Sequence, residues 1–259
     1  MTGPLSERFE IARKENRGVL VGYLPAGLPS VSAGIEAFTA MVSSGVDVLE
    51  VGLPYSDPVL DGPVIQTAVD RALAAGTTTA DVLRTVEGAA RSGAPVLVMT
   101  YWNPIEQYGV DRFARDLAAA GGAGMITPDL TLEEAGPWLA AADATGLDPV
   151  FLVAPSSTDE RVRRIAARCR GFVYATSVMG VTGTRAETSA RAPALVARVK
   201  AVTDTPVAVG LGVSNGDQAA EVAGYADGVI VGSAFVRRVL DGAPVADLAA
   251  DLAAGVRRR

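Results

Sequence analysis

Two carboxylic acids that lie close together in the sequence are the residues best suited to chemistry. Glu50 lies inside an apolar run and Asp61 precedes a segment with helical spacing, both within LEVGLPYSDPVLDGPVIQ, from Leu49 to Gln66. The chain contains no histidine. Near neutral pH, proton transfer must then fall to carboxylates, tyrosines, the single cysteine or a lysine with a shifted pKa. The sequence therefore points to Glu50 and Asp61 as the candidate acid and base.

The surroundings of the two carboxyls predict different behaviour. Side chains alternate along a strand, so Val48, Glu50 and Gly52 share one face, which we expect to point into a barrel. Loss of water there should raise the pKa of Glu50, as a proton shuttle requires. Asp61 precedes Gly62 and a predicted helix, whose dipole would favour the carboxylate anion. The simpler alternative for Asp61 is a helix cap, whereas a charged residue in a buried strand is seldom without a role or a partner.

The elements that must position these carboxyls alternate between strand and helix. Short apolar, β-branched runs alternate with Ala- and Leu-rich segments of helical period, which is typical of a parallel sheet covered by helices. Eight such runs predict a single α/β domain over residues 1–259, folded as a closed (β/α)8 TIM barrel with an extra N-terminal helix. Long second and sixth units predict insertions after those strands. The runs begin at Val19, Asp47, Pro95, Ala123, Pro149, Gly171, Pro206 and Asp227.

Helix starts follow from capping residues. Ser30 and Thr79 each precede a helical segment, and Thr131 with Glu134 forms a capping-box pattern. Ser157 or Thr158 opens a further helix.

Composition narrows the class of protein. The net charge is −6, and the basic residues are scattered apart from the closing Arg257, Arg258 and Arg259, so nucleic-acid binding is not expected. The lone Cys169 excludes an intrachain disulfide and zinc sites built on several cysteines or on cysteine and histidine. Neither lysine, Lys14 or Lys200, lies at the end of a core strand, which argues against Schiff-base chemistry. No run approaches the roughly 20 apolar residues of a membrane span, so we expect a cytoplasmic protein with no membrane association.

Glycine-rich loops at the later strand ends predict a phosphate pocket. Barrels often bind phosphate through backbone N–H groups of the loops after strands seven and eight and the start of a short helix. Tyrosines at the ends of strands one, three and six would surround the same mouth and suit a flat aromatic substrate with a phosphate tail. The glycine loops begin at Gly180, Gly210 and Gly232, and the tyrosines are Tyr23, Tyr101 and Tyr174.

These motifs resemble the tryptophan synthase α subunit family. The likeness spans the whole chain and rests on LEVGLPYSDPVLDGP, with GYLPAG upstream and GVTG and GSAFV downstream. The resemblance implies a TIM-barrel lyase that reversibly cleaves indole-3-glycerol phosphate into indole and glyceraldehyde 3-phosphate, in the last steps of tryptophan biosynthesis, with no metal or organic cofactor. The chain departs from the family's usual residues at Tyr23, Leu28 and Val178.

Matched by position, the resemblance gives roles to particular residues. Glu50 and Asp61 correspond to the family's two catalytic carboxylates. The resemblance also implies substrate contacts at Tyr23, Tyr174, Thr182, Gly183, Gly212, Gly232 and Ser233.

The resemblance further implies a protein partner. Family members pair with a β subunit that binds pyridoxal phosphate, as an α2β2 heterotetramer, and indole passes between the subunits. The expected docking residues are Pro54, Asp57, Pro58 and Asn103. Tyr101, Trp102 and Pro104, if exposed, would suit the same interface, although Trp102 could equally anchor the core.

Three other functions compete with this reading. A sugar-phosphate isomerase or epimerase would keep the phosphate loops, but the metal-dependent epimerases need histidine ligands. A flavin-binding oxidoreductase barrel would give a coloured protein. A catalytically silent partner that only activates a β subunit would not need intact Glu50 and Asp61.

Overall fold

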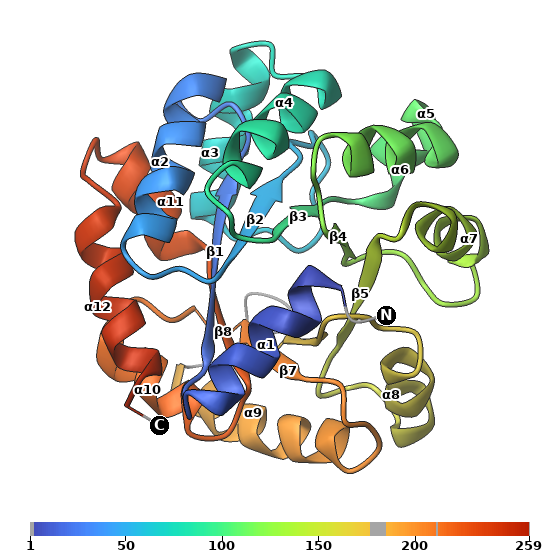
Figure 1. The fold of residues 1–259 in the computed structure, drawn as a ribbon, viewed down its shortest axis with the longest axis vertical. Coiled ribbons are helices and arrows are strands. Elements are labelled where there is room, and N and C mark those ends of the chain that lie inside the picture. Colours follow the sequence, from blue (N-terminus) through green and yellow to red (C-terminus); the bar gives the residue numbers. More distant parts are fainter. Residues whose placement is uncertain (1–2, 177–184, 211, 259) are drawn as a thin grey trace.

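The protein folds as a closed barrel of eight parallel strands, each hydrogen-bonded to the next in sequence order, with β8 closing onto β1 (Figure 1). The coordinates are a computed structural model that describes residues 3–176, 185–210 and 212–258. The predicted TIM barrel is confirmed. Its strands are β1 Val19–Pro25, β2 Val48–Gly52, β3 Val96–Met99, β4 Gly124–Thr127, β5 Asp148–Val153, β6 Val173–Thr176, β7 Val207–Gly210 and β8 Gly228–Val231.

Helices surround the barrel and close one of its ends (Figure 1). The insertion predicted after β2 is an additional helix, α3, placed before α4. The insertion predicted after β6 falls largely on residues 177–184, outside the described residues. The helices are α1 Pro4–Lys14, α2 Val31–Ser43, α3 Pro63–Ala74, α4 Thr79–Ala90, α5 Trp102–Tyr108, α6 Val110–Ala119, α7 Gly136–Thr145, α8 Asp159–Ala166, α9 Arg185–Lys200, α10 Gly216–Ala223, α11 Ser233–Leu240 and α12 Ala246–Val256.

Two of the predicted helix starts are confirmed and two are wrong. Ser30 caps α2, and Thr158 rather than Ser157 caps α8. The cap of α4 is Thr78 rather than Thr79, because only Thr78 has an acidic residue, Asp81, three positions later to complete a capping box.

The second wrong helix start is the predicted capping box of Thr131 and Glu134. These residues form a turn, in which the Glu134 N–H donates to the Thr131 carbonyl and the Thr131 hydroxyl donates to the Glu134 carboxylate at 3.4 Å, and no helix begins there. The helix α7 begins later, at Gly136, with Pro137 in its first turn, where proline needs no N–H partner.

Alternation of side chains along the strands produces two separate apolar clusters. The inner cluster fills the barrel and includes Val21, Val48 and Ile230. The outer cluster packs the strands against the helices and includes Leu49 and Val51. The second strand therefore sends Val48 inward and its neighbours outward, as predicted, and this alternation directs Glu50 into the barrel.

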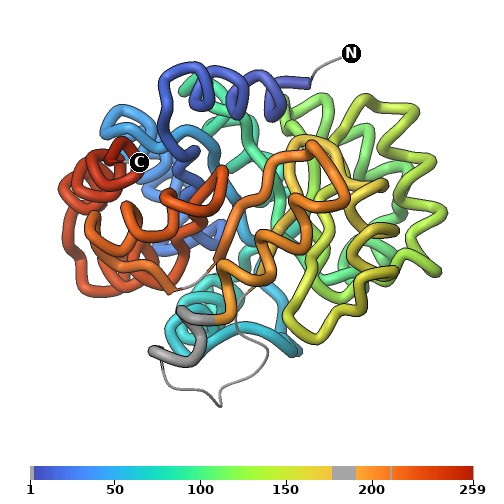
Figure 2. The backbone as a smooth tube through the Cα atoms, turned by 90° about the horizontal axis from the view of Figure 1, so that it is seen from below, coloured from blue at the N-terminus to red at the C-terminus, as the bar shows by residue number. Residues whose placement is uncertain are grey.

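The helix α1 closes the end of the barrel at which the strands begin. Its Leu5, Phe9 and Ala12 are buried in the inner cluster, and the rings of Phe9 and Phe172 lie 5.5 Å apart between centroids. Figure 2 shows α1, in dark blue, across one end of the molecule and the cyan segment of α3 at the other. Among the described helices, none is long and apolar enough to cross a membrane.

A buried ion pair ties the start of β1 to the start of β2. The Arg17 guanidinium donates to both carboxylate oxygens of Asp47, at 2.7 and 2.9 Å, and the Leu20 N–H donates to the same carboxylate at 2.9 Å. Arg17 and Asp47 are each only 7% exposed. Removing one member of such a pair leaves the other charge buried and uncompensated.

We therefore predict that Arg17→Met lowers the free energy of unfolding by about 3 to 5 kcal/mol, measured by urea denaturation. Lys14→Met is the matched control, since it removes the same charge at an exposed position of α1. Equal losses in the two variants would contradict this role of the ion pair.

Candidate active site

Glu50 is a buried carboxyl at the upper end of the barrel interior. It lies on β2 opposite Tyr23 of β1 and Leu97 of β3, and it is 2% exposed. Its Oε2 atom has no hydrogen-bond partner among the described residues. An ionised carboxylate in such a place would lose its hydration without compensation.

The pKa of Glu50 is raised accordingly. Burial raises it from 4.5 to about 8, so the protonated form dominates at neutral pH. The inward direction and the raised pKa agree with the sequence-based expectations. A carboxylic acid with this pKa can give up or take a proton near the working pH of a cell.

Asp61 is placed by Tyr101, not by the helix that follows it. The N-cap of α3 is Gly62 and no side chain caps this helix, so the helix-cap alternative for Asp61 is wrong. The Tyr101 hydroxyl instead donates to Asp61 Oδ1 at 3.0 Å. Burial raises the pKa of Asp61, and the hydrogen bond from Tyr101 partly offsets this effect. The sequence led us to expect that the dipole of α3 favours the Asp61 anion. The interaction that favours the anion is instead the hydrogen bond from Tyr101, and its effect on the pKa is smaller than that of burial.

Tyr101 is a site residue whose role the sequence did not reveal. It is 6% exposed, so Tyr101 does not meet the condition of exposure that would suit it to the interface. Its hydroxyl also accepts the Leu60 N–H at 3.0 Å, and its ring lies 5.4 Å from that of Tyr55. Burial raises the pKa of Tyr101 to about 12, so the hydroxyl stays a donor. The sequence feature that could have indicated this role is the position of Tyr101 just after β3, at the carboxyl ends of the strands.

Two further tyrosines surround the same mouth, as predicted. A side chain at Gly52 would collide with the Tyr23 hydroxyl, and a Cβ at Gly210 would lie 2.6 Å from the Tyr174 hydroxyl. These glycines therefore leave space for the rings. Burial raises the pKa of both tyrosines well above 10, and the charges of Asp61 and Glu50 add to the effect at Tyr23. A negative charge on either carboxyl therefore disfavours ionisation of the Tyr23 hydroxyl.

The described part of the predicted phosphate pocket lies beside Tyr23. Gly232 is the N-cap of α11, without a side-chain cap, and Ser233 is its first residue. A Cβ at Gly232 would lie 3.3 Å from the Tyr23 ring, which places this helix start at the same mouth. Gly212 is exposed and has φ of +67°, which favours glycine. Thr182, Gly183 and Val178 lie outside the described residues.

The expected docking residues differ in exposure. Asp57 and Asn103 are exposed, Pro58 is half-buried and Pro54 is buried. Asn103 Nδ2 donates to the Tyr55 hydroxyl at 3.4 Å, which joins the loop after β2 to α5. Trp102 is half-buried against the outer cluster, in keeping with a core anchor.

Val59 and Leu60, in the loop after β2, are the large apolar side chains that the described structure leaves exposed, at 73% and 46%. Their exposure adds apolar surface beside the expected docking residues.

Comparisons with known proteins agree on one family. A family model for the tryptophan synthase alpha chain matches residues 9–254. The chain belongs to the tryptophan synthase alpha chain family. It is similar to the alpha chains of Acidothermus cellulolyticus, at 64% identity over 98% of this chain and 97% of the relative, and of Thermobifida fusca, at 61% identity over 98% and 97%. A tryptophan synthase structure from Mycobacterium tuberculosis matches with a TM-score of 0.94, at 54% identity over 99% of each chain.

Membership in the tryptophan synthase alpha chain family makes this chain a lyase of tryptophan biosynthesis and implies a β-subunit partner. The match extends through the segments that hold Glu50, Asp61 and the start of α11.

The raised pKa of Glu50 has a consequence for stability. A carboxyl that binds its proton more tightly in the folded state stabilises the fold at low pH, and this contribution is lost as the pH rises from about 4.5 through about 8. We predict that Glu50→Gln, which cannot ionise, lacks this loss, so that its stability relative to wild type increases between pH 5 and pH 9. Urea unfolding of both proteins at pH 5 and pH 9 measures this difference in stability. Glu36→Gln, at an exposed position of α2, should keep the wild-type dependence; an unchanged dependence in Glu50→Gln would contradict the assignment.

Proposed function

We propose that this alpha chain reversibly cleaves indole-3-glycerol phosphate into indole and glyceraldehyde 3-phosphate through acid–base catalysis by Glu50 and Asp61. The observation that carries the proposal is the Glu50 carboxyl, which is buried, lacks a partner on one oxygen and has a pKa near 8. We further propose that residues 1–259 act as one barrel domain in this reaction.

Glu50 moves the proton in this proposal. Cleavage requires a proton on ring carbon 3, after which the hydroxyl on the adjacent glycerol carbon loses its proton. The bond between the ring and that carbon then breaks, its electron pair returns to the ring and the aldehyde forms. A carboxyl that is protonated at neutral pH can donate the first proton and, once ionised, accept the second. The barrel interior around Glu50 excludes water from both steps.

Asp61 stabilises charge in this proposal. Protonation of carbon 3 places positive charge on the ring nitrogen, whose N–H can donate to a carboxylate. One oxygen of Asp61 is engaged by Tyr101, which fixes the carboxylate and leaves its other oxygen to face the ring. The interaction strengthens as the charge develops, so it lowers the barrier rather than tightening the ground state.

The start of α11 supports the placement of the phosphate. Its first N–H groups have no side-chain cap, and the helix dipole favours an anion there. The Tyr23 side chain lies against both Gly232 and Gly52 of β2, so substrate bound here would have its phosphate at α11 and its ring near the carboxyls. We assign substrate contacts to Tyr23, Tyr174, Thr182, Gly183, Gly212, Gly232 and Ser233.

The proposed partner surface lies beside Asp61. We assign it to Pro54, Asp57, Pro58 and Asn103, and we propose an α2β2 heterotetramer with a β subunit that binds pyridoxal phosphate. Exposed Val59 and Leu60 support a protein contact at this loop. The link from Asn103 through Tyr55 and Tyr101 to Asp61 gives the partner a physical route to the site.

Substitution of the two carboxyls tests the reaction. We predict that Glu50→Gln and Asp61→Asn each lower the rate of indole release from indole-3-glycerol phosphate by at least about two orders of magnitude, because each removes a group that the transition state needs. Asp57→Asn, an exposed carboxyl of the same loop, is the control and should retain the rate of the isolated chain. Wild-type rates in Glu50→Gln would refute the mechanism, and an inactive wild-type chain would favour a silent partner.

A charge at the start of α11 tests the phosphate site. We predict that Ser233→Asp raises KM at least about tenfold through repulsion of the phosphate, while Ser233→Ala, which keeps the backbone N–H groups, changes it little. Steady-state kinetics measures both. Equal KM values in the two variants would place the phosphate elsewhere.

A bulky charge on α5 tests the docking surface. We predict that Asn103→Arg weakens binding to a tryptophan synthase β subunit at least about tenfold, because it adds charge and volume within a packed interface. Titration calorimetry measures the affinity. Arg115→Asn, an exposed position on α6, is the control. Unchanged affinity in Asn103→Arg would exclude α5 from the interface.

A further inference from the structure

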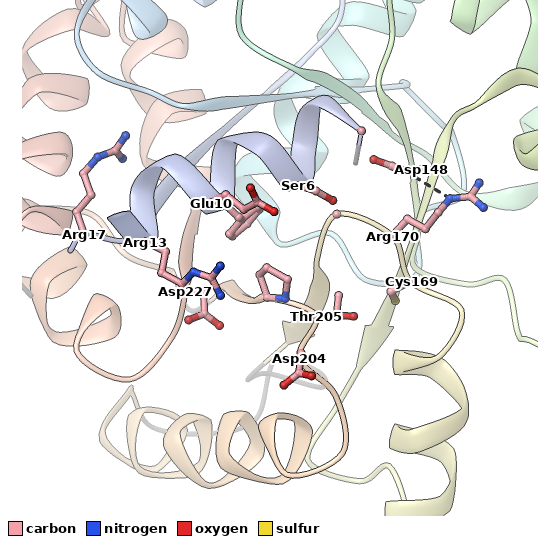
Figure 3. Close-up of a pocket in the computed structure, with 14 residues that line it drawn as sticks. Ser6, Glu10, Arg13, Arg17, Asp148, Cys169, Arg170, Asp204, Thr205 and Asp227 are labelled. Atoms are coloured by element: carbon pink, nitrogen blue, oxygen red, sulfur yellow. Dashed lines mark ion pairs between the residues drawn. The ribbon is translucent and has the colours of Figure 1, made fainter. Parts of the chain in front are cut away.

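A cavity lies at the opposite end of the barrel from Glu50. It occupies about 440 Å³ between α1 and the chain segments that lead into β5 to β8 (Figure 3). Its size falls within the range of small-molecule sites. The carboxyl pair lies where strands end, whereas this cavity lies where they begin, so the two sites are separated by the packed inner cluster.

Asp148 is a buried carboxylate in the wall of this cavity. It is the first residue of β5, and its side chain is 8% exposed. The Oδ1 atom lies 3.4 Å from Arg170 Nε, but Oδ2 is buried and accepts no hydrogen bond from any residue that the structure describes. Gly3 lies against this oxygen, since a Cβ there would approach Oδ2 to 3.1 Å. Asp148 therefore lines the cavity with a carboxyl whose Oδ2 atom has no hydrogen-bond partner among the described residues.

The cations around the cavity do not neutralise Asp148 fully. Arg170 makes its shorter contacts elsewhere, at 2.5 Å to both the Asp143 carboxylate and the Leu147 carbonyl. Arg17 is held by Asp47. Arg13 lies ten residues after Gly3 on α1, about 15 Å away along the helix. Burial raises the pKa of Asp148, and Arg170 only partly offsets this effect.

The remaining walls supply two further acceptors and an apolar side. Ser6 and Glu10 lie one helical turn apart on the face of α1 that lines the cavity (Figure 3). Phe9 and Cys169 provide the apolar wall. The Cys169 thiol is not a nucleophile, because burial raises its pKa to about 12.

We propose that this cavity binds a small organic ammonium ion, with the ammonium group against Asp148 and the hydrocarbon part against Phe9 and Cys169. A primary ammonium group has three donors and no acceptor, which matches the acceptors of Asp148, Ser6 and Glu10. An anion would meet the Asp148 and Glu10 carboxylates, and an apolar molecule would leave Oδ2 buried without a partner. The proposal is independent of the reaction at Glu50.

Titration of the full-length, ¹⁵N-labelled chain with n-butylammonium chloride tests the proposal. We expect saturable shifts of the Ser6 and Gly171 amide signals, with a dissociation constant on the order of millimolar for so small a ligand. Butyrate and n-butanol have the same hydrocarbon chain without the cation and should give no saturable shift. Equal shifts with either molecule, or none with n-butylammonium because the cavity holds only solvent, would overturn the proposal.

Variants locate the binding. Asp148→Asn should weaken n-butylammonium at least tenfold, while Asp143→Asn, the same change at the other carboxylate partner of Arg170 and outside the cavity, should stay within twofold. Equal weakening would indicate diffuse charge attraction and overturn the assignment. If thermal unfolding shows that Asp148→Asn does not fold, Ser6→Leu fills the cavity from α1, with exposed Glu7→Leu as its control. Retained binding in Ser6→Leu would also overturn the proposal.

Discussion

The burial of the Glu50 carboxyl without a partner on Oε2 is the constraint on which the rest of the site depends. A carboxyl placed there keeps its proton, because ionisation without water costs several kcal/mol. The barrel can hold such a group only because the inner and outer clusters stabilise β2 on both of its faces. The fold thus contains one carboxyl whose burial is unfavourable. The same burial raises its pKa into the range that general acid–base chemistry near pH 7 needs.

The two ends of the barrel differ in the contacts that they contain. At the end where strands begin, α1 closes the inner cluster and Arg17 joins β1 to β2. At the end where strands finish, glycines leave space for tyrosine rings, and Tyr101 holds Asp61 from a different strand unit. The buried ion pair and the candidate catalytic carboxyls therefore lie at opposite ends, as is usual for barrels whose loops carry the chemistry.

Sequence patterns predicted what depends on short-range periodicity. The eight strands, the inward direction of Glu50 and the extra helix after β2 follow from alternation and from spacing along the chain. Contacts between distant segments could not be predicted this way. Tyr101 holds Asp61 across a separation of 40 residues, and Asp148 meets α1 only because that helix folds back across the barrel. The error at Thr79 was local. Any of three successive threonines could cap α4, and Thr78 does so because Asp81 lies three positions after it.

Neutron diffraction from crystals grown in heavy water at about pH 6.5 would test the central claim most directly, because it locates the titratable deuterons. The account predicts a deuteron on the Glu50 carboxyl and none on Asp61, with the Tyr101 deuteron directed at Asp61 Oδ1. A Glu50 carboxylate that is ionised under these conditions, or paired with a cationic side chain, would contradict the account.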